Sequence, residues 1–238
     1  MTGVWKRVMV KLSGEALMGE TTHGLHAETV ERIAKDLALA ASDGTEVAVV
    51  VGGGNFFRGI QGADKGIERA RADSIGMLAT VMNALALEQA IESQGQPARA
   101  LSAVAMPSIC QPYSRQAALN HLAKGRVVVL AGGVGHPFFT TDTGAALRAA
   151  ELSCDLIMKA TQVDGVYSAD PKKDPHAKRY ERITHDDAIA QNLAVMDTAA
   201  FALARENAIP IAVFELKKPE SITTALKGQG RFTLVVPR

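Results

Sequence analysis

The sequence has 238 residues, of which 47% are hydrophobic, so it can bury a sizeable core as one large domain or two small ones. Its 26 Lys and Arg residues nearly balance 25 Asp and Glu residues. The formal charge of +1 argues against the strongly positive field on which non-specific binding to nucleic acid or anionic membranes depends. Aromatic residues make up only 5% while glycine numbers 21, which favours tight turns over an aromatic stacking surface.

The cysteines and the N-terminus indicate a cellular compartment. Cys110 and Cys154 are far apart, without a Cys-x-x-Cys spacing or a His cluster, so neither a disulfide framework nor a structural zinc site is predicted. The first residues run straight into a strand-like segment rather than a signal sequence. No uninterrupted apolar run approaches the about 20 residues of a membrane span. We therefore expect a soluble, cytoplasmic protein that binds no membrane and no nucleic acid.

Short β-branched segments alternate with helical patterns along the chain. Most of these segments are continuously apolar, as strands covered on both faces must be. The predicted strands are residues 8–12, 47–51, 98–103, 127–131, 156–160, 211–214 and 232–236. Between them, apolar residues recur at spacings of three and four, which is typical of helices packed on a sheet. Examples are Val30, Ile33, Ala34, Leu37 and Ala38, and then Met77, Leu78, Val81, Met82 and Leu85.

The capping and turn residues between these elements support one continuous α/β domain over residues 1–238. Ser114 can cap the helix that follows it, and Gly125 stands where that helix must end before the next strand. The segment 169–182 is polar and contains two Asp-Pro steps, which predict a surface loop. No linker or fixed repeat is visible. The predicted fold is a three-layer α/β sandwich with a largely parallel central sheet.

Polar residues and glycines gather directly after three of the predicted strands. In a doubly wound sheet a ligand lies beyond the carboxyl ends of the strands, so these segments are candidates for a site. Glycine lets backbone N–H groups approach an anion, and a nearby Lys or Arg supplies the charge that a phosphate requires. The residues are Lys11, Ser13, Gly14 and Glu15; Gly52, Gly53, Gly54, Asn55 and Arg58; and Gly132, Gly133, Gly135, Thr140, Thr141 and Asp142.

A single glycine cluster is also what a tight turn without a ligand shows. Three clusters at one sheet edge, two of them with a cation, predict a kinase-like site that holds two phosphorylated ligands head to head. The sequence contains neither Gly-x-x-x-x-Gly-Lys-Ser/Thr nor Gly-x-Gly-x-x-Gly. Their absence disfavours P-loop enzymes and ordinary dinucleotide dehydrogenases.

Six strings at or near these strand ends resemble the amino-acid kinase family, and within it the bacterial-type UMP kinases. The match extends over nearly the whole chain, and the strings occur in the family's order. They are KLSGEAL from Lys11, VVVGGGNFFRG from Val49, ADSIGMLATVMNALAL from Ala72, GHPFFTTDTGA from Gly135, KATQVDGVYSADPKKDP from Lys159 and VMDTAAFALARE from Val195.

The resemblance implies an ATP site formed by the first two strand ends and by residues beyond the fifth strand. Lys11 would neutralise charge on the transferring phosphoryl group, and Arg58 would reach the phosphates at the transfer point. The implied ATP-binding residues are Lys11, Leu12, Ser13, Gly14, Gly54, Arg58, Thr161, Tyr167 and Asp170. Mg²⁺ is implied as the counter-ion of ATP, held mainly by phosphates and water, so no protein ligand is named.

The resemblance also implies a UMP site. Gly53 would bring its backbone against UMP, and Asp73 would accept from the ribose hydroxyls. Asp142 would orient the catalytic groups, which are Lys11 and Arg58. The implied UMP-binding residues are Gly53, Asp73, Val134, Gly135, His136, Pro137, Phe138, Phe139, Thr140 and Thr141. Residues 1–150 would roughly form the acceptor half and residues 151–238 the ATP half.

The implied activity is transfer of the ATP γ-phosphoryl group to UMP, giving UDP and ADP, in pyrimidine nucleotide biosynthesis. Relatives assemble as hexamers, and GTP and UTP are possible effectors. Many relatives carry Thr-Gly-Asn where this chain has Val134-Gly135-His136, so only a backbone role is carried over for these residues. The segment 19–24, GETTHG, has the length of the family's GTP-effector region but no distinctive composition.

Other interpretations stay open for single residues. Asp142 also fits a first-turn residue favoured by the helix dipole. Asp73 could be a solvated helix carboxylate, Tyr167 could pack beside a turn, and Asp197 could be an N-terminal helix charge.

Other functions stay open for the whole chain. On the same fold, aspartate, acetylglutamate and carbamate kinases have small carboxylates as acceptors, whereas Asp73 and the segment 138–141 favour a nucleotide. A non-catalytic nucleotide-binding or anion-storage protein would not need Lys11. A nucleic-acid-binding regulator would have a basic face, which the charge balance does not indicate.

Overall fold

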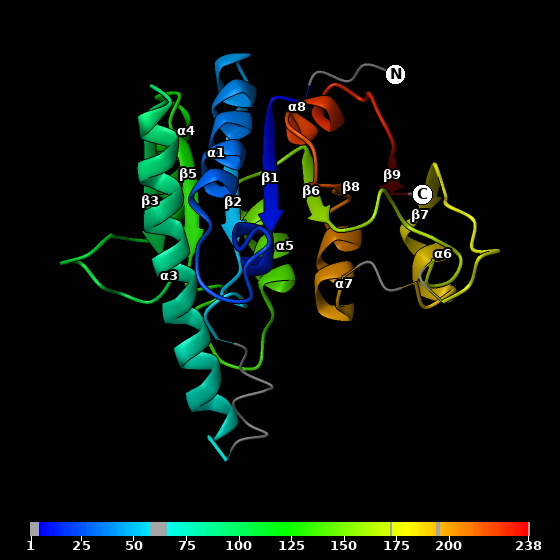
Figure 1. The fold of residues 1–238 in the computed structure, drawn as a ribbon, viewed down its shortest axis with the longest axis horizontal. Coiled ribbons are helices and arrows are strands. Elements are labelled where there is room, and N and C mark those ends of the chain that lie inside the picture. Colours follow the sequence, from blue (N-terminus) through cyan, green and yellow to red (C-terminus); the bar gives the residue numbers. More distant parts are fainter. Residues whose placement is uncertain (1–4, 58–65, 172, 194–195, 238) are drawn as a thin grey trace.

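The computed structural model describes residues 5–57, 66–171, 173–193 and 196–237. Among these residues, nine strands form one sheet in the order β4-β3-β5-β2-β1-β6-β8-β9-β7, in which only the β8–β9 pair is antiparallel (Figure 1). The strands are β1 (Arg7–Leu12), β2 (Glu46–Val51), β3 (Ala98–Ser102), β4 (Gln111–Pro112), β5 (Val127–Ala131), β6 (Leu156–Thr161), β7 (Arg182–Thr184), β8 (Ile211–Glu215) and β9 (Phe232–Val236).

Helices cover both faces of this sheet, so the predicted three-layer α/β fold is confirmed. The helical elements are η1 (Gly14–Leu17), α1 (Ala27–Ser42), α3 (Arg69–Ser93), α4 (Arg115–Leu122), α5 (Thr141–Glu151), α6 (His185–Ala190), α7 (Thr198–Glu206) and α8 (Ser221–Leu226). α1, α3 and α8 share one apolar core with strand residues such as Val8 and Val10. α4, α5, α6 and α7 share the other with Met9 and Ala48, because alternate strand residues point to opposite faces.

All seven predicted strands are present, with ends shifted by one residue at most. The sequence reading missed β4 and β7, which have two and three residues and lie at the two edges of the sheet. Neither is an apolar run, because an edge strand of this length buries little surface. Ser114 caps α4 as predicted, with its Oγ accepting from Ala117 N at 3.2 Å, and Gly125 follows that helix with φ +70°. The described residues between 169 and 181 contain no helix and no named strand, as expected of a loop, and β7 begins at Arg182, the last residue of the predicted segment.

The apolar stripe predicted for the long helix α3 is only partly buried: Val81 is in the core and Leu85 packs against it. Leu78 and Met82 are 48% and 51% exposed, whereas small residues such as Ala79 and Ala84 are buried against α1, β3 and β5. The buried face of α3 therefore combines small residues with the larger Val81, Leu87 and Ile91. By length and composition α3 could also cross a membrane, but a helix packed in the core of a soluble protein passes the same test.

Candidate active site

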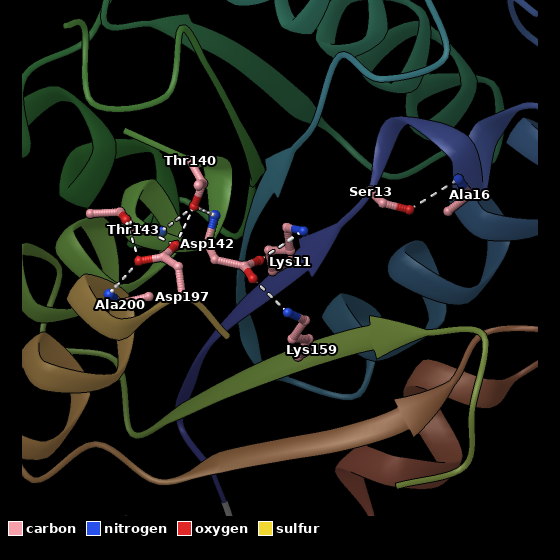
Figure 2. A network of polar contacts seen from close by, with 9 residues as sticks. All are labelled: Lys11, Ser13, Ala16, Thr140, Asp142, Thr143, Lys159, Asp197 and Ala200. Carbon is pink, nitrogen blue, oxygen red and sulfur yellow. Dashed lines mark hydrogen bonds and ion pairs between the residues drawn. The ribbon is translucent and has the colours of Figure 1, made fainter. Parts of the chain in front are cut away.

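Two lysines and one aspartate meet at the carboxyl ends of the central strands. Lys11 of β1 and Lys159 of β6 are register partners in the parallel pair, so both side chains leave the same face of the sheet side by side. Asp142, in the first turn of α5, lies between their Nζ atoms, at 2.8 Å from Lys11 and 2.5 Å from Lys159 (Figure 2). We call Lys11, Asp142 and Lys159 the two-lysine cluster. It carries a formal charge of +1, which suits an anionic ligand.

Burial strengthens the interactions within this cluster. The side chains of Lys11, Asp142 and Lys159 are 10%, 13% and 15% exposed. Burial alone would raise the pKa of Asp142, but Lys11 and Lys159 outweigh it and hold that pKa below its ordinary value. Burial lowers the pKa of Lys159, with Lys11 adding to the effect and Asp142 opposing it. Asp142 is therefore an ionised bridge between two cations, as well as a first-turn helix residue.

Asp197 ties the start of α5 to the start of α7. Thr140 caps α5 by accepting from Asp142 N at 3.1 Å and Thr143 N at 3.2 Å, and its hydroxyl donates to Asp197. Thr143 Oγ1 donates to the same carboxylate at 3.0 Å, and Ala200 N donates at 3.0 Å as Asp197 caps α7. Asp197 is thus an N-terminal helix residue, the alternative left open above, and it also anchors the turn that carries Asp142 (Figure 2).

The first two glycine clusters are pressed against each other. A Cβ on Gly14 would lie 2.5 Å from both Gly54 N and Asn55 Oδ1, so only glycine fits there without movement. Ser13 caps the following η1 turn through Ala16 N at 3.2 Å. Asn55 is buried and exchanges two hydrogen bonds with Asn83 of α3, at 2.7 and 2.9 Å. This close contact holds the backbone of the two strand ends together beside Lys11.

A cavity of about 130 Å³ opens between the start of α3 and the segment after β5. It brings together most of the residues predicted for the acceptor, while Gly135, Pro137 and Phe138 lie outside its lining. Its lining includes Gly53, Asp73, Val134, His136, Phe139, Thr140 and Thr141, together with Phe57, Gly76, Met77, Thr80 and Gly133. Gly53 packs tightly on α3, since a Cβ there would lie 2.7 Å from Gly76 O.

Asp73 is engaged within the protein. Its carboxylate accepts from Arg69 Nε at 2.8 and 2.9 Å and from the backbone N–H of Phe138 at 2.8 Å. Phe138 has φ +72°, a left-handed conformation that is uncommon for a bulky residue. The contact therefore holds the strained part of the segment after β5 against α3. Asp73 is not the freely solvated helix carboxylate of the simpler interpretation.

A larger cavity of about 530 Å³ lies beside the two-lysine cluster. Lys159, Thr161, Tyr167 and Asp170 all line it, so the three residues predicted for the nucleoside side of ATP are neighbours. The Tyr167 hydroxyl donates to Asp164 at 2.5 Å. The Thr161 hydroxyl donates to Val163 O at 2.6 Å and shapes the turn beyond β6.

Leu12 has no exposed side-chain surface and belongs to the core, so only its backbone can approach a ligand. Its carbonyl already accepts from Gly52 N at 2.9 Å. Arg58 lies outside the described residues, and its role stays a prediction.

The sequence reading missed Lys159 as a site residue and missed the Asn55–Asn83 pair. Lys159 could have been found because it is a single cation inside the otherwise uncharged segment LIMKAT, close to the end of its strand as Lys11 is in β1. Nothing in the sequence pairs Asn55 with Asn83, because that contact depends on how α3 packs on the sheet.

A largely parallel sheet with glycine-rich strand ends, a buried pair of lysines and two nearby cavities is the arrangement expected of a phosphotransferase of the kinase type. A model of the amino acid kinase family matches residues 6–215. A uridylate kinase from Azorhizobium caulinodans is 61% identical over 233 residues, covering 98% of both chains. One from Paramagnetospirillum magneticum is 54% identical and covers 97% of this chain and 96% of its own.

Solved structures agree with these relatives. The crystal structure of UMP kinase from Ureaplasma parvum has a TM-score of 0.93 at 35% identity and covers 98% of this chain and 99% of its own. The UMP kinase from Bacillus anthracis also has a TM-score of 0.93, at 38% identity, covering 98% and 96%. The chain belongs to the amino acid kinase family and, within it, to the uridylate kinases.

Proposed function

We propose that this chain transfers the γ-phosphoryl group of ATP to UMP, giving ADP and UDP. The observation that carries the proposal is the two-lysine cluster, which lies near two cavities in a chain 61% identical to a uridylate kinase. Thr141, next to Asp142, lines the smaller cavity, and Lys159 lines the larger one. A phosphoryl group that passes from one cavity to the other would move past both lysines.

The reaction needs positioning and charge stabilisation more than covalent help from the protein. Lys11 and Lys159 would face the transferring group, where their Nζ atoms meet the negative charge spread over its oxygens. Asp142 would hold the two ammonium groups at a fixed spacing and offset part of their repulsion before a ligand arrives. The buried setting makes each of these interactions stronger than it would be in water.

The two cavities divide recognition between the halves of the chain. We assign the smaller cavity, lined by residues of the first 150, to UMP, with Asp73 on the ribose. We assign the larger cavity, lined by residues beyond 150, to the nucleoside part of ATP, with Thr161, Tyr167 and Asp170 beside it. Leu12, Ser13, Gly14 and Gly54 would present backbone to the phosphates.

Mg²⁺ fits this site as part of the ATP complex. Among the described residues, no group of three His, Cys, Asp or Glu side chains is placed to hold a metal ion, and Asp142 is already paired with two lysines. Such a donor set suits an ion held mainly by phosphate oxygens and water. When bound with ATP, Mg²⁺ neutralises phosphate charge, while Lys11 and Lys159 act on the group in transit.

We further propose a cytoplasmic homo-oligomer, a hexamer by resemblance, that serves pyrimidine nucleotide biosynthesis. The exposed side chains of Leu78 and Met82 on α3 support self-association, because exposed large apolar groups favour a partner surface. Cys110 and Cys154 are both free thiols, which suits a reducing compartment. Control by GTP or UTP stays a prediction.

The test is ADP release with UMP, CMP, AMP, dTMP, aspartate and N-acetylglutamate offered in parallel, with Lys11→Met as the inactive control. We expect UMP to be the best acceptor by a wide margin. Faster turnover with aspartate or N-acetylglutamate would replace this proposal with an amino-acid kinase activity. Nucleotide binding without turnover for any acceptor would favour the storage alternative.

A further inference from the structure

The turn after β5 has an unusual backbone that something must hold in place. Gly132, Gly133 and Gly135 have φ values of +75°, +55° and +90°, so the chain turns through three left-handed residues within four positions. Gly133 and Val134 of this turn line the smaller cavity. A segment of glycines has little conformational preference of its own, so its shape depends on what contacts it.

The turn is held from two sides, by a side chain of α3 and by the backbone after β3. Thr80 Oγ1 of α3 accepts from Gly132 N at 2.7 Å. Beyond β3, a Cβ on Gly132 would lie 2.9 Å from Val104 N, so the two backbones are in direct contact. These contacts fix Gly132, and the Gly135 N–H donates to Gly132 O at 2.9 Å, which closes a turn around the peptide that joins Gly133 to Val134. The carbonyl oxygen of that peptide is contacted from a third side.

Arg148 of α5 supplies that third contact. Its side chain is only 8% exposed, and NH2 donates to Gly133 O at 3.4 Å. NH1 donates to Glu151 at 2.7 Å, and the guanidinium lies 3.9 Å over the centre of the Tyr113 ring. The Tyr113 hydroxyl donates to the same Glu151 carboxylate at 2.5 Å. The ion pair with Glu151 and the Tyr113 ring thus fix the guanidinium, with NH2 directed at the turn.

We propose that Arg148 is a positioning residue that orients the Gly133–Val134 peptide for the acceptor, an inference that rests on the proposed function. In a trans peptide the carbonyl and the next N–H point in opposite directions. With Gly133 O held toward Arg148, Val134 N–H faces away from it, free to donate to an oxygen of the acceptor nucleotide.

Arginine suits this task because one guanidinium can bond Glu151 and Gly133 O at the same time and still stack on a ring. Lysine would keep the charge beside Glu151 but lacks the planar fork, so it cannot hold both partners in this geometry. The role is indirect, because Arg148 lies behind the turn and the lining of the smaller cavity does not include it.

The test compares Arg148→Lys and Arg148→Met with Arg115→Gln as the matched control. Arg115 is an exposed arginine of α4 whose Nε donates to the backbone carbonyl of Glu151 at 2.5 Å. We expect both Arg148 variants to raise the KM for UMP about tenfold and to leave the KM for ATP nearly unchanged. Arg115→Gln should change neither constant.

Amide hydrogen exchange gives a second readout that needs no activity. In the Arg148 variants we expect faster exchange confined to residues 132–139, with Arg148→Lys available if the methionine variant does not fold. An unchanged UMP KM in Arg148→Lys, an equal rise of both KM values, or the same UMP effect in Arg115→Gln would each overturn the proposal. If the unmodified chain does not phosphorylate UMP, the proposed function fails, while exchange still tests whether Arg148 orders the turn.

Discussion

Replacing Asp73 should weaken UMP through the ribose and leave ATP nearly unaffected. The carboxylate has two oxygens with about four acceptor sites. Arg69 Nε is shared between both oxygens, and Phe138 N takes one site on Oδ2. Acceptor capacity therefore remains on Oδ1 for a ribose hydroxyl. Asp73 also lines the smaller cavity, where such a hydroxyl would lie.

The expected size of the effect comes from one charge-assisted hydrogen bond. Such a bond contributes roughly 1.5 to 3 kcal/mol, so its loss should raise the KM for UMP by about 10- to 150-fold. Asp73→Ala should also free the Phe138 N–H, which is exposed enough to turn to water. Asp73→Asn keeps an acceptor oxygen for Phe138 and removes the charge, so its KM should fall between those of the parent and the alanine variant.

The assay is kcat/KM for UMP and deoxy-UMP in the parent, Asp73→Ala and Arg69→Gln, read as a double-mutant cycle. Deoxy-UMP should be a poor substrate of the parent because the carboxylate loses its 2′-hydroxyl partner. That penalty should shrink in Asp73→Ala and persist in Arg69→Gln, which disturbs the pair but keeps the carboxylate. If the ratio of kcat/KM for UMP to that for deoxy-UMP is unchanged in Asp73→Ala, Asp73 does not recognise the 2′-hydroxyl. Its role is then the contact with Phe138 or a contact with the 3′-hydroxyl alone.

Three further predictions concern the cluster, the donor cavity and the far end of the sheet. Lys11→Met and Lys159→Met should each lower kcat by about 100-fold or more while changing UMP affinity little, and near-full turnover in steady-state kinetics would remove that lysine from the mechanism. Tyr167→Ala should raise the KM for ATP and spare that for UMP; the reverse outcome would interchange the two cavities. His185 is 1% exposed with both ring nitrogens unpaired within the described structure, and burial lowers its pKa. Because the unfolded chain then binds the proton more readily, stability should fall as pH drops below about 6.5, by at most about 1.4 kcal/mol per pH unit from this group. Urea unfolding at several pH values should show a smaller acid loss in His185→Leu than in the parent, and equal losses would exclude the histidine as the cause.

The fold could be predicted wherever burial restricts a segment to apolar residues. Buried parallel strands must be apolar on both faces, and all seven such strands were found with ends within one residue. The edge strands β4 and β7 have no such requirement and were missed. The apolar stripe predicted for α3 was only partly right, because Val81 is buried whereas Leu78 and Met82 are exposed.

The candidate site was predictable to the extent that its residues follow strands directly. The glycines and Lys11 stand at or just after strand ends in the sequence, and Asp142 of α5 meets Lys11 in the structure. Asp197 and Lys159 needed more information, since their contacts depend on how α7 meets α5 and on the register between two strands. The Asp73–Phe138 contact joins residues 65 positions apart through a backbone N–H, which no side-chain pattern reports.

The position of the two-lysine cluster follows from the order of the strands. β1 lies between β2 and β6, and the chain reaches these neighbours by different routes. From β1 it passes through α1 on one face to β2, while α5, which leads into β6, lies on the opposite face. A crevice opens beyond the strands at such a switch point. Because Lys11 and Lys159 are register partners there, a slip of one residue between β1 and β6 would send one lysine to the other face. The pairing of these two strands thus sets the spacing of the charges on which the proposed transfer depends.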